Sequence, residues 1–147
     1  MRFIGRYFLK VDEKGRFALP GELKATLGDA VWKPFFITTG VSWLDLYTKE
    51  DWELFLLKND SLPSMDPKVQ QFQTLYVYAA KEVGFDKAYR FLIPQRMRQE
   101  AGLGNDIVMQ GLGDKIRIFS EQAWKEWNEE AKASYVYTTT QYADKFK

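Results

Sequence analysis

The chain has 147 residues with a formal net charge of +1, and it contains neither cysteine nor histidine. The missing residue types exclude Ser-His and Cys-His nucleophile pairs and zinc sites built on Cys or His. Hydrophobic residues make up 46% of the chain, enough for a folded core, but no apolar run reaches the length of a membrane span or a signal peptide. We therefore expect a cytoplasmic protein with no membrane contact, no metal, no cofactor and no small-molecule substrate.

The first third of the chain predicts two hairpins, each followed by a helix. Residues 7–11 and 16–19 read as short strands around a tight turn, in which Gly15 supplies a positive φ. Pro20 is expected to open a short helix that Gly28 closes. Residues 35–39 and 44–47 predict the second hairpin, and residues 49–57 predict a helix that buries Trp52.

The rest of the chain repeats this order after a linker. Residues 58–67 are polar with two prolines, and Asp66-Pro67 is a typical helix start. From residue 80 the pattern is again strand, turn, strand, helix, hairpin and helix, with Gly111 to Lys115 read as a turn and not a phosphate loop. Residues 134–147 are expected to be a tail that is ordered only when something docks it. The predicted division is 1–60, first repeat; 61–79, linker and helix; 80–133, second repeat; 134–147, tail.

The repeat is visible in the residues themselves. Residues 11–20 and 85–94 share Asp, Arg, Phe and Pro at one offset of 74, and Trp52 and Phe55 are matched by Trp124 and Trp127 at an offset of 72. Each half alone would bury little area. We expect the halves to complete each other's sheet around a pseudo-two-fold axis, in a small barrel-like α+β fold.

Basic charge coincides with the repeated pattern. Residues 2–16 hold five basic and two acidic side chains, and residues 86–98 hold four basic and one acidic. A folded protein could present both segments on one face. The pairs Asp12–Arg16 and Asp86–Arg90 have two compatible interpretations: an ion pair that pins each turn, or an Asp that shapes the turn while the Arg projects outward to nucleic acid.

The five tryptophans could form a stacking platform, but buried aromatics are the simpler interpretation. Trp52 and Trp124 hold matched helix positions, where burial is ordinary. Trp43, at a hairpin tip, is the one expected to be exposed.

The doubled pattern resembles the two signatures of the MraZ family over roughly residues 3–130. The matching residues of the first signature are Gly5, Tyr7, Asp12, Lys14, Gly15, Arg16 and Pro20; those of the second are Glu82, Val83, Asp86, Arg90, Ile93, Pro94, Arg98, Ala101, Gly102 and Leu103. The resemblance implies two AbrB- or MazE-like repeats in a double-split β-barrel. It also implies bacterial transcription factors that assemble into rings, bind short G-rich promoter repeats and often repress their own cell-division and cell-wall gene cluster.

On this basis we expect a nucleoid-associated, sequence-specific DNA-binding regulator that is not an enzyme. The expected DNA contacts are Lys14 and Arg16, helped by Arg2, Arg6, Lys10, Lys87 and Arg90, while Asp12, Gly15 and Asp86 shape the turns. The alternative is a ring-forming scaffold whose basic loops dock acidic protein surfaces; an enzyme using lone carboxylates is a distant third.

One departure from the family pattern concerns the second turn. Tyr89 stands where the family has glycine, and a Tyr at positive φ costs about 1–2 kcal/mol. We therefore expect the second turn to differ in shape and the first turn to make the main contact.

Overall fold

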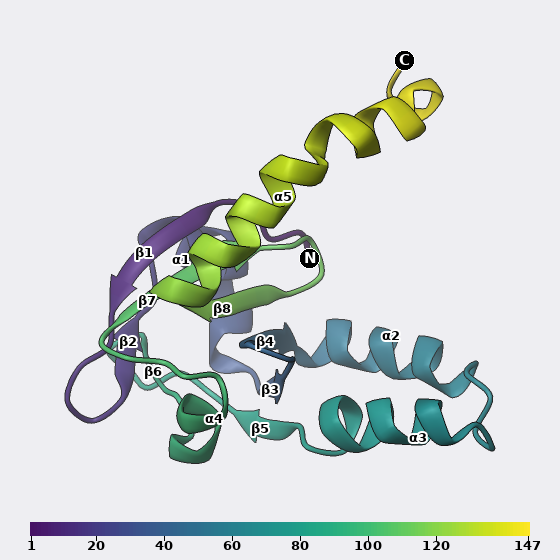
Figure 1. Cartoon of the computed structure of the whole chain (residues 1–147). Helices are drawn as coiled ribbons and strands as arrows, with labels where there is room; N and C mark the ends of the chain where they lie inside the picture. The colour runs from purple at the N-terminus through teal and green to yellow at the C-terminus, as the bar shows by residue number, and fades with distance from the viewer.

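The computed structural model describes all 147 residues: two sheets form the body of the molecule, and helical segments project from it (Figure 1). The larger sheet is antiparallel and six-stranded, in the order β1-β7-β8-β4-β3-β5. Its strands are β1 (Arg6–Lys10), β3 (Phe35–Thr39), β4 (Trp43–Thr48), β5 (Lys81–Val83), β7 (Asp106–Gly111) and β8 (Ile116–Ser120).

A second, two-stranded sheet lies over one face of the first and is formed by β2 (Arg16–Ala18) and β6 (Arg90–Leu92). Each of these strands leads through a proline into a short helix, α1 (Gly21–Leu27), which continues as the 3-10 turn η1 (Gly28–Trp32), or α4 (Gln95–Glu100). The main core of 19 buried residues lies between the two sheets and these helices. Alternation along the strands sends every second side chain to this core.

The other helices start from the other face of the large sheet. They are α2 (Lys49–Asp60), α3 (Pro67–Phe72) with the π-helical turn η2 (Gln73–Val77), and α5 (Glu121–Gln141) with the final turn η3 (Ala143–Phe146). Two small clusters seat them: Tyr47, Trp52 and Val77 under α2 and η2, and Val108, Phe119 and Trp124 under α5. None of the helices combines the length and apolar character that a bilayer-spanning segment needs.

The strand pairing is symmetric between the two halves of the chain. Phe17 faces Phe91 at the centre of β2–β6, and these positions are 74 apart. Asp45 faces Arg117 at the centre of β4–β8, and these are 72 apart. The first strand of each half pairs with the third strand of the other, β1 with β7 and β5 with β3. The two halves therefore share one sheet, as expected.

Two sequence expectations about pairing are wrong. Residues 7–19 do not form a hairpin, because β1 bonds to β7 while β2 bonds to β6 in the other sheet. The barrel is not closed either: β1 and β5 are the two edges of the large sheet, and no ladder joins them. The α+β class, the hairpin of residues 35–47 and the Asp66 N-cap, which accepts a 2.8 Å bond from the Lys68 N–H, are confirmed.

The expectations for the tryptophans are met in part. Trp52 and Trp124 are buried, as predicted. Trp43 is not the exposed tryptophan: its ring lies 4.3 Å from the Arg117 guanidinium and is half-buried, whereas Trp32 is 50% exposed. α5 runs through residues 134–141 as regular helix, and the expectation that docking orders residues 134–147 stays a prediction.

Candidate nucleic-acid interface

The first turn, residues 12–16, is held by a single carboxylate. Asp12 Oδ1 accepts the N–H groups of Lys14 and Arg16, both at 2.9 Å, and Asp12 Oδ2 accepts the Nε–H of Arg16, also at 2.9 Å. The backbone closes the turn with bonds from Asp12 N–H to the Arg16 carbonyl and from Gly15 N–H to the Asp12 carbonyl. The carboxylate thus fixes both the turn and the base of the arginine side chain.

The second turn, residues 86–90, has the same bonds, so the expectation of a different shape is wrong. Asp86 accepts from the N–H groups of Ala88 and Arg90 at 2.8 and 2.9 Å and from Arg90 Nε–H at 3.0 Å. Tyr89 takes φ 59°, the one positive value outside glycine, at the position where Gly15 has 87°. The bonds to Asp86 and the symmetric pairing of β2 with β6 hold this backbone despite the side chain.

Tyr89 also gains contacts that offset part of its strain. Its ring centroid lies 4.8 Å from that of Trp32, and Lys24 Nζ lies 4.3 Å above the ring. Stacking and cation–π contacts of this kind contribute about 0.5–1.5 kcal/mol each. The opposite face of the turn is fixed by a bond from Leu19 N–H to the Tyr89 carbonyl at 2.9 Å. The tyrosine is therefore an integral part of the second turn.

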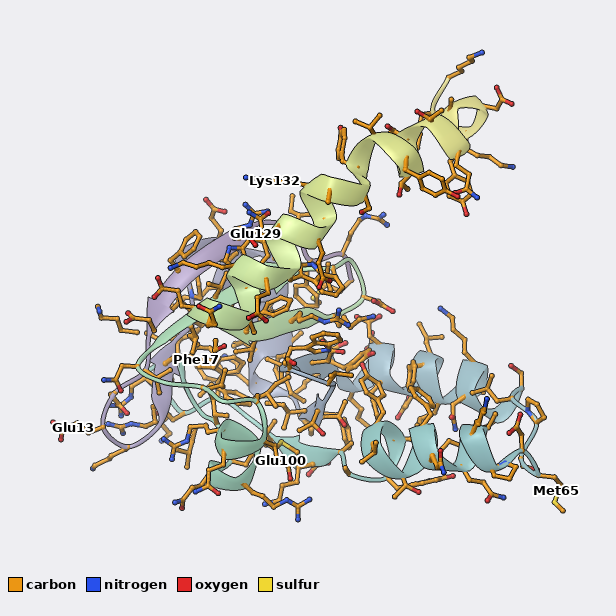
Figure 2. All side chains as sticks on the ribbon, in the orientation of Figure 1. Glu13, Phe17, Met65, Glu100, Glu129 and Lys132 are labelled. Atoms are coloured by element: carbon orange, nitrogen blue, oxygen red, sulfur yellow. The ribbon has the colours of Figure 1, made fainter.

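Both turns present their arginines on one surface. Arg16 lies opposite Leu92 and Arg90 opposite Ala18, so these four residues share the outer face of β2–β6, while Phe17 and Phe91 point into the core. Diagonal neighbours of this kind are about 7–8 Å apart. Because Nε is the one guanidinium donor used within the chain, both terminal nitrogens of each arginine are free to bind an external acceptor. Figure 2 shows the first turn at the edge of the molecule, with Glu13 outermost.

The pKa of the turn carboxylate is lowered in both turns. Hydrogen bonds from the backbone N–H of Arg16, followed by its side chain, lower the pKa of Asp12 below the ordinary 3.8. The corresponding groups of Arg90 lower the pKa of Asp86. The carboxylates are therefore ionised at neutral pH, and each arginine keeps its orienting partner.

The remaining predicted residues fall into two groups. Lys14 and Lys87 lie on the turns, are exposed and make no ion pair. Arg6 and Lys10 lie on β1 and point to the α5 side of the sheet, where Arg6 stacks 4.3 Å over Trp124 and Lys10 pairs with Asp106 at 2.9 Å. Arg2 is exposed near the β7–β8 connection, beside the Phe3–Gly113 bridge. The structure thus gathers Lys14, Arg16, Lys87 and Arg90 and leaves Arg2, Arg6 and Lys10 elsewhere.

Two basic residues that the sequence did not assign to the site lie against the turns. Arg98, on α4, covers Gly15 so closely that a Cβ there would sit 2.5 Å from its Cζ. Lys24, on α1, covers Tyr89. Lys24 and Arg98 are 74 residues apart, so each turn is covered by a basic residue from the other half. The offset of 74 between Lys24 and Arg98 is visible in the sequence and marks them as equivalent positions. The contacts they make could not be predicted, because each contact joins residues at least 65 positions apart.

The chain is similar to known proteins. A family model described as "MraZ protein, putative antitoxin-like" matches residues 77–146. The protein named transcriptional regulator MraZ from Heliobacterium modesticaldum is 35% identical over 90% of this chain and 91% of its own length. The chain belongs to the MraZ family. Proteins of the same name from Syntrophomonas wolfei and Clostridium tetani are 31% and 33% identical, over 90% and 86% of this chain and 91% and 87% of theirs.

Membership confirms the resemblance read from the two signatures. The MraZ family model spans the second half of the chain, whereas the relatives align over 86–90% of its length. The second turn accommodates Tyr89 at a positive φ.

Proposed function

We propose that this chain is a sequence-specific DNA-binding transcriptional regulator and that the outer face of β2–β6 is its DNA contact. The observation that carries the proposal is the pair Arg16 and Arg90, half-buried on the outer face of one sheet with Nε fixed by Asp12 and Asp86. The shared name of the relatives, transcriptional regulator MraZ, supports it.

The chemistry of the face suits double-stranded DNA. A guanidinium with two free nitrogens in one plane can bind guanine O6 and N7 or two phosphate oxygens. Lys14 and Lys87, on the same turns, are flexible cations suited to the flanking phosphates. In this arrangement the arginines read sequence and the lysines supply affinity that depends on salt.

The finer parts of the proposal follow from the family resemblance. The two halves, residues 1–60 and 80–133, are AbrB-like repeats joined by residues 61–79, and residues 134–147 are an appended segment. Subunits assemble into a closed ring, and adjacent subunits engage successive short promoter repeats, so that avidity multiplies modest contacts. The chain acts in the cytoplasm at the nucleoid, as a repressor of its own cell-division and cell-wall gene cluster, without enzymatic activity.

The test is fluorescence anisotropy with a duplex from upstream of the chain's own gene and a shuffled duplex of equal composition. Counterion release makes affinity fall by about 0.9 log units per log unit of salt for each phosphate neutralised. Two contacts per subunit then predict a loss of about tenfold or more between 50 and 200 mM salt. Equal binding of both duplexes, or binding independent of salt, would overturn the proposal.

A ring-forming protein scaffold is the second candidate, because large apolar side chains are exposed on α3, η2 and α5, among them Leu75, Tyr135 and Tyr142. A scaffold would assemble normally and bind neither duplex. The same anisotropy series therefore separates the two functions.

A further inference from the structure

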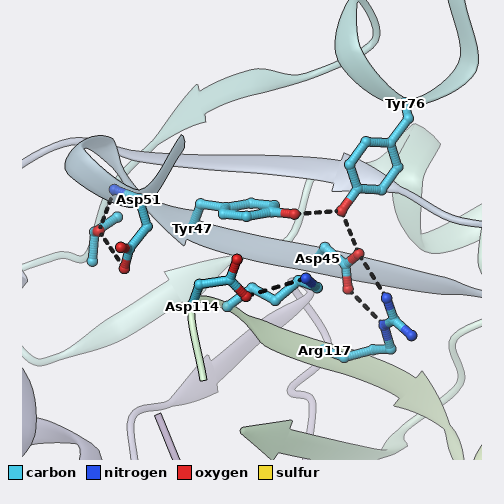
Figure 3. Close-up of polar contacts among 8 residues, drawn as sticks. Asp45, Tyr47, Asp51, Tyr76, Asp114 and Arg117 are labelled. Atoms are coloured by element: carbon cyan, nitrogen blue, oxygen red, sulfur yellow. Dashed lines mark hydrogen bonds and ion pairs between the residues drawn. The ribbon is translucent and has the colours of Figure 1, made fainter. Parts of the chain in front are cut away.

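One half-buried arginine in this protein has no acidic partner. The chain has four half-buried arginines, and three of them bind a carboxylate. Arg16 and Arg90 bind the aspartates of their own turns, and Arg117 binds Asp45 through Nε at 2.8 Å and Nη2 at 3.1 Å (Figure 3). The fourth is Arg98, on α4, which makes no side-chain hydrogen bond and no ion pair within the chain.

Arg98 lies flat against the first turn. A Cβ added at Gly15 would sit 2.5 Å from Cζ, 2.7 Å from Nη1 and 2.8 Å from Nε of this side chain. These nearly equal distances place the plane of the guanidinium face-on to the glycine. Gly15 is therefore buried although it lies on a turn. Any side chain at that position would push the guanidinium away.

Backbone hydrogen bonds hold Arg98 in this position. The N–H of Ile93 donates to the Gly15 carbonyl at 3.0 Å, which ties the start of α4 to the turn. The N–H of Arg98 donates to the Pro94 carbonyl at 3.0 Å, and its own carbonyl accepts from the N–H of Leu103 at 2.9 Å. The helix cannot leave the turn without breaking these bonds, so the guanidinium is fixed before any partner arrives.

The nitrogens of Arg98 are arranged for an acceptor outside the chain. Nε is buried and makes no hydrogen bond, which is unfavourable for a charged donor. Nη1 and Nη2 are not buried, so one edge of the guanidinium, with its N–H groups free, reaches the surface. Such an edge binds two oxygens of a phosphate group side by side. Because Gly15 directly precedes Arg16, this edge lies beside the proposed DNA face.

The equivalent residue at the second turn has a different geometry. Lys24, which is 74 positions before Arg98, lies over the ring of Tyr89, with Nζ 4.3 Å from the ring centroid. The same ring packs against Trp32. The tyrosine ring thus stands where the first turn has only the hydrogen of a glycine, and Lys24 already has a partner. The two turns are therefore not equivalent as phosphate sites, and the unpartnered cation is at the first.

We propose that Arg98 binds a backbone phosphate of the DNA beside the first turn and thereby fixes the position of Arg16 on the duplex. Phosphate contacts set the register of a protein on DNA without reading its sequence. The inference rests on the proposed function and deepens it, because it adds a contact from the second half of the chain to the turn of the first.

The test replaces single phosphates of the promoter duplex by neutral methylphosphonates and measures binding by anisotropy. Arg98→Gln is compared with the wild type and with Arg96→Gln as the matched control. Arg96 lies on the same helix but about 200° around its axis from Arg98. Its side chain is 76% exposed and pairs with Glu100 at 3.1 Å.

At least one substituted linkage should weaken binding by the wild type and by Arg96→Gln about tenfold or more, which is the value of a hydrogen bond between charged groups. The same linkage should cost Arg98→Gln nothing, because the donor that it served is absent. The slope of log affinity against log salt should fall by about 0.9 for each engaged Arg98→Gln subunit and stay unchanged for Arg96→Gln.

Arg98→Lys decides the question if circular dichroism shows that Arg98→Gln folds poorly. It keeps the charge but loses the two-donor edge, so the sensitive linkage should cost it less than it costs the wild type. If every linkage costs the folded Arg98 variant as much as the wild type, or no linkage is sensitive, the phosphate contact is overturned while promoter preference stands. A wild type without promoter preference would overturn the proposed function and this contact together.

Discussion

Phe17 and Phe91 face each other at the centre of the β2–β6 pair, with ring centroids 5.4 Å apart and ring planes inclined by 28°. They hold the same place in the two halves of the chain, and both are almost fully buried. Because neighbouring residues on a strand point to opposite faces, this stacked pair fixes Arg16 and Arg90 symmetrically on the outside. The geometry of the proposed DNA face is thus set from within the core.

Arg16→Ala should abolish measurable promoter binding while leaving the fold intact. The side chain is 26% exposed and its one internal bond is to an exposed turn carboxylate, so its removal costs little stability. Loss of a bidentate contact is worth about 1–3 kcal/mol per subunit, and the proposed ring would multiply this loss. Anisotropy with the promoter duplex measures the loss, and circular dichroism checks the fold.

Lys49→Ala is the matched control for Arg16→Ala, because Lys49 is exposed at the start of α2 on the other side of the sheet. It should bind like the wild type. Binding of Arg16→Ala at wild-type affinity would remove the turn from the DNA contact, and an unfolded Arg16→Ala would mean that the ion pair is structural.

Tyr89→Ala should destabilise the protein more than Tyr89→Gly. Both changes remove the contacts with Trp32 and Lys24, but alanine keeps the cost of a positive φ, about 1–2 kcal/mol, which glycine relieves. In urea unfolding, the free energy of unfolding of the glycine variant should be about 1–2 kcal/mol higher than that of the alanine variant. Equal stabilities would show that the turn changes shape when the ring is absent.

Acidification should weaken the turns in a defined pH range. Because the pKa values of Asp12 and Asp86 are lower in the folded protein than the ordinary 3.8, the stability that these groups contribute is present above pH 3.8 and is lost as pH falls through the lower folded values. Thermal unfolding from pH 7 to pH 2 should show this loss in the wild type.

Asp12→Asn/Asp86→Asn should melt lower at neutral pH and lose less melting temperature on acidification. Asp60→Asn, at an exposed carboxylate without an ion pair, should follow the wild-type curve. A double variant with the same pH dependence as the wild type would place the acid-sensitive groups outside the turns.

Asp45→Ala should be among the most destabilising single changes in the chain. Asp45 is fully buried and Arg117 is 13% exposed, so the change leaves a cation in the layer interior without its partner. Breaking a buried pair from one side costs about 3–5 kcal/mol, whereas replacing both members costs far less. Chemical denaturation of Asp45→Ala and of Asp45→Leu/Arg117→Met should separate the two effects; a double variant as unstable as the single one would contradict this account.

Structural features that depend on residues close together in the sequence could be predicted from it. The Asp–Arg bracket of each turn, the Asp66 cap and the hairpin before α2 all depend on local spacing, and all are present. The choice of strand partner depends on distant segments, and for that reason the hairpin of residues 7–19 was predicted wrongly.

The turn shape at Tyr89 and the positions of Lys24 and Arg98 could not be predicted from the sequence, because they also depend on contacts between distant segments. The side-chain rule against positive φ is local, but the bonds from Asp86 and the ring contact with Trp32 outweigh it. Lys24 and Arg98 sit over turns in the opposite half of the chain, and a repeat offset alone does not reveal which turn each one covers.

The Asp45–Arg117 pair also determines which half-chains can associate. If residues 1–60 were a separate molecule pairing with its own copy in this register, Asp45 would meet Asp45; two copies of the other half would set Arg117 against Arg117. Buried like charges cost several kcal/mol. Pairing of either half with its own copy is therefore disfavoured, whereas pairing of the two different halves is favoured. If the halves were made as separate polypeptides, they would form an obligate heterodimer.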